Sequence, residues 1–215
     1  MLVLAIALGL SLLIKSFLVQ AFFIPSPSME ETLIEGDRVL VSKLTPGPFH
    51  LAHGDVVVFK DPDHWLGEGT AAPEGETPIR KAARETLTFI GLLPSDSGQH
   101  LIKRVIGLPG DHVVCCNGQG KLTVNGAPLD EPYLYPGDEP STKTFDITVP
   151  ANQLWVMGDH RGVSQDSRFH TPGTVPIDDV VGRAFVVVWP FDRWKFLHEP
   201  TDTFSNVPAA GSGGG

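Results

Sequence analysis

The sequence predicts a mostly β domain that follows one membrane-spanning helix. Three observations support this fold class: short Val-rich runs bounded by Gly and Pro recur along the chain, an Asn125-Gly126 dipeptide suits a tight hairpin turn, and residues 2–24 are almost wholly apolar. The predicted strands cover residues 38–42, 55–59, 101–106, 112–114, 122–124, 145–149, 154–157 and 183–189.

The chain has 215 residues and a formal net charge of −9, from 16 Lys and Arg against 25 Asp and Glu. This length allows one good-sized hydrophobic core. Binding to nucleic acid requires concentrated positive charge to neutralise phosphates, and the sequence has no Lys/Arg cluster. We therefore expect no nucleic-acid partner.

Residues 2–24 carry a single charge, Lys15, and predict a transmembrane anchor. A helix needs about 20 apolar residues to cross the roughly 30 Å hydrocarbon layer. A cleaved signal peptide is the alternative, but its apolar core is usually only about 7–15 residues long and a small-x-small site should follow it. Phe22-Phe23-Ile24-Pro25 follows here instead, which favours an anchor in the lipid bilayer.

A domain over residues 25–200 follows the anchor, with an insertion at 61–100 and a flexible tail at 201–215. Within the insertion we expect a loop over 63–77 and a short helix over 79–93, where apolar residues recur at close to helical spacing. The last apolar run, 184–191, is too short to be a second span.

The cysteines and histidines do not form a metal-binding pattern. Cys115 and Cys116 are adjacent, which suits neither a CxxC redox pair nor a zinc site. A vicinal disulfide and two free thiols both stay open, and small apolar strand residues are the simplest interpretation. We predict no metal and no cofactor.

A serine-containing segment begins where the predicted anchor ends. Ser26 and Ser28 are two residues apart and are framed by Pro25 and Pro27, which stiffen the backbone. The arrangement predicts a fixed loop that presents hydroxyl groups at the membrane surface. Most serines in such segments simply form turns, so this segment alone does not identify a nucleophile.

A lysine interrupts the otherwise apolar predicted strand 101–106. Alternation places Leu101, Lys103 and Val105 on one face, the side that usually faces a core or a cleft. Burial lowers the pKa of a lysine below about 10.4. A neutral amine could then take a proton from a serine, whereas the alternative is a lysine whose ammonium group reaches solvent.

A dense polar segment follows the strand at 154–157. It contains two Asp, two Arg and two Ser around a Gly turn, in the order Met157-Gly158-Asp159-His160-Arg161-Gly162-Val163-Ser164-Gln165-Asp166-Ser167-Arg168. So many charged and hydroxyl groups after a strand suit a hydrogen-bonded network that supports a site, although a solvated loop is the alternative.

These segments resemble four motifs of the bacterial type I signal peptidase (leader peptidase) family, peptidase S26. The motifs PSPSMEETL, GDVVVFKDP, LIKRVIGLPGD and MGDHRGVSQDSR occur in the family's order. The resemblance runs from the anchor to about Arg183, and the Cys-Cys layout further resembles the enzymes of high-GC Gram-positive bacteria.

The resemblance implies a signal-peptidase-like β-fold catalytic domain on the extracytoplasmic side of the cell membrane. The activity implied is that of a single-pass membrane serine endopeptidase that removes N-terminal signal peptides from exported preproteins, near the protein export machinery. Cleavage would follow small-x-small sites and proceed through an acyl-enzyme.

The resemblance also implies roles for individual residues. Ser28 would be the nucleophile and Lys103 the general base, while the Ser28 N–H and the Ser26 hydroxyl would form the oxyanion hole. Ser164 would hydrogen-bond to Lys103 and orient it. The supporting residues would be Asp159, Arg161, Asp166 and Arg168, and the substrate pockets would be lined by Ile24, Met29, Leu33 and Ile102.

The sequence departs from the family pattern at a few positions. Pro27 replaces a frequent Gly, Glu31 replaces a Pro, and His160 and Gly162-Val163 replace the usual Asn and Asp-Asn. Two other classes remain: another Ser-Lys peptidase such as a self-cleaving repressor, and a membrane-tethered β domain that binds without cutting. The anchor disfavours the first, and the presence of both Ser28 and Lys103 disfavours the second.

Four aromatic residues near the end of the domain allow two interpretations. Trp189, Phe191, Trp194 and Phe196 would either rest at the membrane interface, where Trp is common, or form a buried hydrophobic cluster.

Overall fold

The computed structural model describes residues 6, 18–62, 64–66 and 100–211. Within this part of the chain, no helix is long and apolar enough to cross a membrane. The helix expected at 79–93 and most of the expected anchor lie outside the described residues.

The last part of the predicted anchor is a strand. Strand β1 (Val19–Phe23) pairs antiparallel with β2 (Arg38–Ser42), from Val19 opposite Ser42 to Phe23 opposite Arg38. The prediction of one helix through residue 24 is therefore wrong for residues 19–23. An apolar run alone does not separate a spanning helix from a strand, and β-branched and aromatic residues favour the pleated arrangement once β2 offers a partner.

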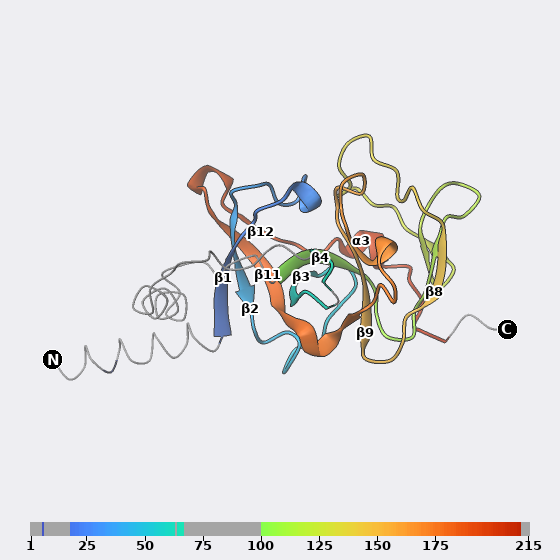
Figure 1. Ribbon diagram of the computed structural model, residues 1–215, viewed down its shortest axis with the longest axis horizontal. Coiled ribbons are helices and arrows are strands. Elements are labelled where there is room, and N and C mark those ends of the chain that lie inside the picture. The colour runs from blue at the N-terminus through green and yellow to red at the C-terminus, as the bar shows by residue number, and fades with distance from the viewer. Residues whose placement is uncertain (1–5, 7–17, 63, 67–99, 212–215) are drawn as a thin grey trace.

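A large antiparallel sheet carries most of the chain (Figure 1). Its strands follow the order β1-β2-β11-β3-β4-β9-β10, and β12 pairs with β11. The bounds of the strands not yet given are β3 (Val56–Lys60), β4 (His100–Gly107), β9 (Gln153–Met157), β10 (Val175–Pro176), β11 (Val180–Trp189) and β12 (Lys195–Phe196). Strand β4 lies between β3 and β9, so its residues from Leu101 to Gly107 are all buried.

A smaller sheet has the order β7-β6-β5-β8, from β5 (His112–Cys115), β6 (Thr123–Val124), β7 (Ala127–Pro128) and β8 (Phe145–Thr148). The expected hairpin is confirmed: Val124 pairs with Ala127, and Asn125 and Gly126 adopt φ values of 51° and 82°, as a two-residue type I′ turn requires. Cys115 and Cys116, for which three interpretations were open, are joined by a disulfide.

Short helices connect the strands: η1 (Pro27–Met29), η3 (Ser167–Phe169), η4 (Ile177–Asp179), η5 (Phe191–Arg193) and α3 (Thr201–Phe204). Helix α3 and the residues after it correct the expectation of a flexible tail from 201. Phe204 is buried against the second sheet's core and stacks on His53, and Asn125 donates a hydrogen bond to the Pro208 carbonyl. The tail prediction is therefore wrong for 201–208, because the buried Phe204 ring and the hydrogen bonds of Thr203 and the Pro208 carbonyl place a segment of polar composition.

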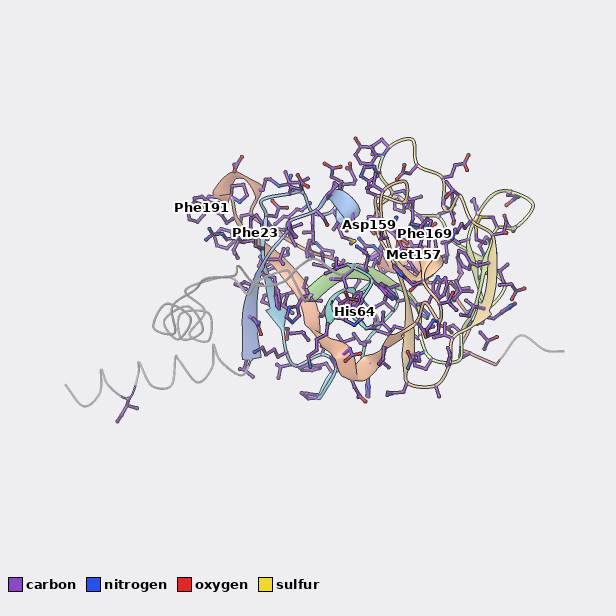
Figure 2. All side chains as sticks on the ribbon, viewed as in Figure 1. Phe23, His64, Met157, Asp159, Phe169 and Phe191 are labelled. Atoms are coloured by element: carbon purple, nitrogen blue, oxygen red, sulfur yellow. A yellow bond between two sulfur atoms is a disulfide. The ribbon has the colours of Figure 1, made fainter. Side chains whose placement is uncertain are left out.

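An exposed group of aromatic side chains lies at one end of the large sheet. We refer to Phe23, Trp189, Phe191, Trp194 and Phe196 as the aromatic rim; Phe191 is the most exposed, at 71%. Phe23 and Trp189 both stand beside Arg38 in the strand register, and Trp189 packs edge-on against Phe191. Figure 2 shows Phe23 and Phe191 at this same end of the molecule. The alternative of a buried aromatic cluster is therefore wrong.

Candidate active site

Ser28 lies on the short helix η1, which follows strand β1 after a three-residue connection. Ser26 is extended (φ −138°, ψ 154°) and Pro27 starts the helical turn, where a fixed φ and a missing N–H are tolerated. The segment is fastened at both ends: Ile24 N–H donates to the Asp37 carbonyl, and His160 N–H donates to the Ser28 carbonyl at 3.2 Å. The Ser28 hydroxyl is thereby presented from a rigid turn.

The Lys103 side chain meets this hydroxyl. Lys103 lies on β4 opposite Val57 of β3, and its Nζ is hydrogen-bonded to Ser28 Oγ at 2.6 Å. Lys103 is only 3% exposed, and Ser28 is also buried. Ser26 Oγ lies 3.3 Å from Ser28 Oγ. Residues from two segments 75 positions apart thus converge on one buried hydroxyl.

Burial controls the ionisation of Lys103. Loss of hydration lowers the pKa of its ammonium group from 10.5 to about 8, because the charged form is the one that needs water. The carboxylates of Asp166 and Asp159 act in the opposite direction and raise the pKa, whereas Arg168 lowers it. Desolvation is the largest of these effects, so a substantial neutral fraction exists at mildly alkaline pH.

A buried ion pair lies beside this contact. Arg104, the residue after Lys103, donates from Nε and Nη2 to the two carboxylate oxygens of Asp159 at 2.8 and 2.6 Å. Its Nη1 donates to the Gly54 carbonyl, and Thr32 Oγ1 donates to Asp159. This bidentate arrangement ties β4 to the loop after β9.

A second buried ion pair orders the same loop from its far end. Arg168 donates from Nε and Nη2 to the two carboxylate oxygens of Asp166, each at 2.8 Å, and the Gly158 N–H donates to Asp166 at 2.9 Å. Burial alone would raise the pKa of Asp166, but the hydrogen bonds and charge of Arg168 lower it below its ordinary value. The carboxylate therefore stays ionised and fixes the turn at Gly158.

Gly158 is where this loop approaches Ser28 most closely. A Cβ atom at this position would lie 2.3 Å from Ser164 Oγ and 2.4 Å from the Ser28 carbonyl oxygen. Only glycine permits that approach. Ser164 is buried nearby, but within the described residues its Oγ does not form the expected hydrogen bond to Lys103.

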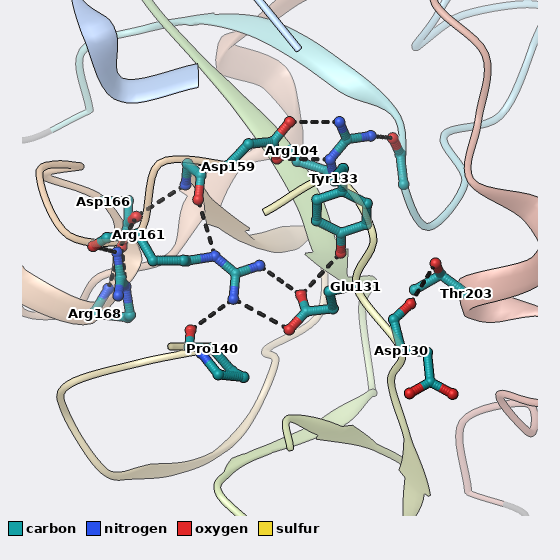
Figure 3. A network of polar contacts seen from close by, with 12 residues as sticks. Arg104, Asp130, Glu131, Tyr133, Pro140, Asp159, Arg161, Asp166, Arg168 and Thr203 are labelled. Carbon is teal, nitrogen blue, oxygen red and sulfur yellow. Dashed lines mark hydrogen bonds and ion pairs between the residues drawn. The ribbon is translucent and has the colours of Figure 1, made fainter. Parts of the chain in front are cut away.

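Arg161 has a partner that the sequence analysis did not identify. Its guanidinium forms an ion pair with Glu131 at 2.5 Å, and Tyr133 donates from its hydroxyl to the same carboxylate (Figure 3). Glu131 and Tyr133 lie in the loop after β7, outside the four motifs. No local pattern marks a single acidic residue in a loop, because its partner lies 30 residues away.

The four residues expected to line substrate pockets lie together in one buried cluster. Ile24, Met29 and Leu33 have at most 1% of their surface exposed, and Ile102 has 8%. A cavity of about 240 Å³ lies nearby and is lined instead by Thr32, Val56, Arg104, Tyr133 and residues of the C-terminal segment. Within the described residues, no three His, Cys, Asp or Glu side chains gather closely enough to hold a metal ion.

Comparison with known proteins agrees with the resemblance in the motifs. Residues 1–189 match the family described as "Signal peptidase, peptidase S26". A probable signal peptidase I of Mycobacterium leprae is 38% identical over 219 residues, covering 88% of this chain and 75% of its own. Signal peptidase I of Mycobacterium tuberculosis is 39% identical over 212 residues, covering 88% of this chain and 71% of its own.

A crystal structure of a signal peptidase I from Enterococcus faecalis is 25% identical and has a TM-score of 0.41, covering 63% of this chain and 97% of its own. A buried Ser-Lys contact on a mostly β fold defines a class of serine peptidase. On the strength of the family match and the mycobacterial relatives, the chain belongs to the signal peptidase family, peptidase S26, and is an enzyme of the signal peptidase I type, as in high-GC Gram-positive bacteria.

Proposed function

We propose that the protein is a membrane-bound serine endopeptidase that removes N-terminal signal peptides from exported preproteins with a Ser28/Lys103 dyad. The observation that carries this proposal is the 2.6 Å contact between Lys103 Nζ and Ser28 Oγ in a buried setting. No histidine is needed, because a neutral lysine amine can act as the base.

The reaction begins with proton transfer from Ser28 Oγ to the neutral Lys103 Nζ. Oγ forms a bond to the carbonyl carbon of the scissile peptide, and the resulting tetrahedral intermediate collapses as the Lys103 ammonium protonates the departing amine. Water then gives a proton to Lys103 and attacks the acyl-enzyme. Collapse of this second intermediate returns the proton to Ser28 and releases the signal peptide as a carboxylate.

The negative charge of each intermediate requires hydrogen-bond donors placed in advance. We propose that the Ser28 N–H and the Ser26 hydroxyl supply them. The Ser26 Oγ–Ser28 Oγ distance of 3.3 Å supports this assignment, because it places the second donor beside the reacting oxygen. Pro27 keeps the two serines in this relation by limiting the backbone between them.

We propose that Ser164 and the ion pairs of Asp159, Arg161, Asp166 and Arg168 support the dyad. Their carboxylates raise the pKa of Lys103 while burial lowers it, and this balance supports a base that works near neutrality. We further propose that Ile24, Met29, Leu33 and Ile102 form the apolar floor on which the small side chains of a small-x-small site rest. Their shared cluster, which includes Met29 directly after Ser28, supports this role.

We propose that the catalytic domain rests on the extracytoplasmic surface of the cell membrane, near the export machinery. The apolar run that precedes β1, residues 2–18, is at the lower limit of about 17 residues for a span. The aromatic rim supports this orientation, since it includes Phe23 on β1, the strand that follows this run directly. Exposed Trp and Phe side chains suit the membrane interface.

The test is cleavage of a model preprotein by the detergent-solubilised protein, wild type beside Ser28→Ala, with sequencing of the product's N-terminus. We expect the wild type alone to cut after a small-x-small site. Cleavage by both proteins would exclude Ser28 as nucleophile. Cleavage by neither, in correctly folded samples, would favour a membrane-tethered domain that binds without cutting.

A further inference from the structure

Glu131 is a buried carboxylate for which the proposed dyad and its motifs provide no role. Its side chain is only 2% exposed, although it lies in a loop. Its Oε1 accepts hydrogen bonds from Arg161 Nη2 at 2.5 Å and from the Tyr133 hydroxyl at 2.9 Å, and its Oε2 accepts from Arg161 Nη1 at 3.3 Å. A carboxylate is rarely buried to this extent unless it is paired.

Arg161 transmits this contact to the loop that touches Ser28. Its Nε donates to the Gly158 carbonyl at 2.9 Å, and its own carbonyl accepts a hydrogen bond from Arg168 Nη2 at 2.9 Å. Gly158 in turn lies against the Ser28 carbonyl. Although burial alone would lower the pKa of Arg161, the Glu131 carboxylate raises it, so the guanidinium stays charged.

Tyr133 links Glu131 to the second cation of the site. The Arg104 guanidinium carbon lies 4.1 Å from the centre of the Tyr133 ring, within the range of a cation–π contact. Arg104 holds Asp159, and Asp159 is the residue between Gly158 and His160. Glu131 is therefore linked to Gly158 through Arg161, and to Asp159 through Tyr133 and Arg104; Figure 3 shows Glu131 among Arg161, Tyr133 and Arg104.

The C-terminal segment fixes the backbone next to Glu131. Thr203 Oγ1 of helix α3 donates to the Asp130 carbonyl at 2.7 Å. Asp130's own side chain, by contrast, points to solvent, with 83% of it exposed, and pairs with Lys121. The neighbouring carboxylates thus differ completely in environment, which provides a matched control.

We infer that Glu131 is a positioning residue of the peptidase: it holds Arg161 so that the Gly158–His160 segment keeps Ser28 aligned with Lys103. The inference rests on the proposed Ser28/Lys103 reaction. Without the carboxylate, the Arg161 guanidinium is left buried without its counter-ion and the Gly158 carbonyl loses a fixed donor. The substrate-contacting residues proposed above are not touched by this change.

The test compares Glu131→Gln with Asp130→Asn in cleavage of a model preprotein. We use single-turnover rate constants with enzyme in saturating excess, because these do not depend on the fraction of folded molecules. We expect Glu131→Gln to lower the rate constant at least tenfold with the half-saturating enzyme concentration within twofold of wild type. Asp130→Asn should match wild type in both quantities.

A rate constant for Glu131→Gln within twofold of wild type would overturn the inference, as would an equal loss in Asp130→Asn. If Glu131→Gln does not fold, Tyr133→Phe decides: it removes one donor to Glu131 and leaves the ring against Arg104. We expect it to lower the rate constant at least twofold, and an unchanged value would overturn the inference. Ser28→Ala in the same assay tests the dyad separately, since activity in that variant refutes the dyad whatever Glu131 does.

Discussion

The carbonyl oxygen of Ser28 accepts a hydrogen bond from the backbone N–H of His160 at 3.2 Å. The loop after β9 thus holds the serine by its main chain, while Lys103 contacts it by its side chain. The His160 ring is directed elsewhere: its Nδ1 lies 3.1 Å from Glu30, and its face stacks on Tyr135. The backbone of His160 therefore holds Ser28, while its side chain contacts Glu30 and Tyr135.

His160→Asn, which restores the residue usual in the family, should preserve activity. The N–H that holds Ser28 belongs to the backbone and is unaffected by the change. We expect kcat/KM within about threefold of wild type, with a small loss of stability from the lost stacking on Tyr135, of roughly 0.5–1.5 kcal/mol. Steady-state cleavage and thermal unfolding measure the two effects. A loss of activity larger than tenfold would assign the imidazole itself a part in the reaction.

Gly158→Ala should strongly reduce the rate. The added methyl group would lie 2.3 Å from Ser164 Oγ and 2.4 Å from the Ser28 carbonyl oxygen, so the serine loop must move. Overpacking of this kind costs about 1–3 kcal/mol in stability. A displaced nucleophile costs on the order of 100-fold in rate. Gly162→Ala is the control, because Gly162 is exposed and its added methyl would meet only the side chain of Asp138, at 3.0 Å. Equal rates for the two variants would contradict this prediction.

The rate of cleavage should rise with pH through a midpoint near 8. Only neutral Lys103 can accept the Ser28 proton, and its pKa is lowered to about 8 by burial. Below that pH the ammonium form predominates and kcat/KM should fall about tenfold per pH unit. Lys103→Arg should be inactive at every pH, because a guanidinium does not deprotonate in proteins. A midpoint near 10.5 would contradict the prediction, because it would show that the lysine acting as the base is exposed to water.

Lys103→Met should stabilise the protein at neutral pH. The folded state holds this lysine at a lowered pKa of about 8 against 10.5 when unfolded, so between these values the unfolded chain binds more protons and stability rises with pH. Below pH 8 the full penalty applies, about 3 kcal/mol at 1.36 kcal/mol per pKa unit. Urea unfolding at pH 7 and at pH 10.5 measures it: the gain from methionine should be present at the first and nearly absent at the second. A gain equal at both would remove ionisation as its cause.

The aromatic rim should matter on membranes and not in detergent. Phe191→Ser combined with Trp194→Ser removes two exposed aromatic groups at and just after η5, whereas Ser28 lies on η1 and Lys103 on β4. We expect cleavage in proteoliposomes to fall at least fivefold, while cleavage of a soluble peptide in detergent stays within twofold of wild type. Phe49→Ser, another exposed aromatic group outside the rim, is the control. Equal losses in both media would refute the role of the rim.

The sequence predicted the residues at the centre of the site more fully than their surroundings. Val-rich runs located β2, β3, β4, β5, β9 and β11 to within a few residues, since alternation and turn residues are local signals. Ser28 and Lys103 followed from motifs. The strand at 19–23 did not, because its partner β2 and not its own composition decides its structure.

Contacts between residues far apart along the chain could not be predicted from the sequence, for the same reason. Glu131 acquires its role only when the loop after β7 meets Arg161, and Phe204 orders the C-terminal segment only by inserting into a core formed by other parts of the chain. Neither residue lies in a periodic pattern. Contacts between residues distant along the chain are identified in the folded structure, whereas secondary-structure propensity and residue spacing describe only residues close together in the sequence.

The position of β11 determines how much of the chain must be synthesised before the large sheet can form. β11 lies between β2 and β3, and the segment after it reaches back to Asp130 and Asn125. Strands β2 and β3 thus remain unjoined until residues 180–189 have been made, and the loop at 130 receives its contacts from the C-terminal segment only after residue 203 has been added. A growing chain therefore carries Ser28 and Lys103 long before it carries the complete sheet, and we expect peptidase activity only when nearly the whole domain has emerged.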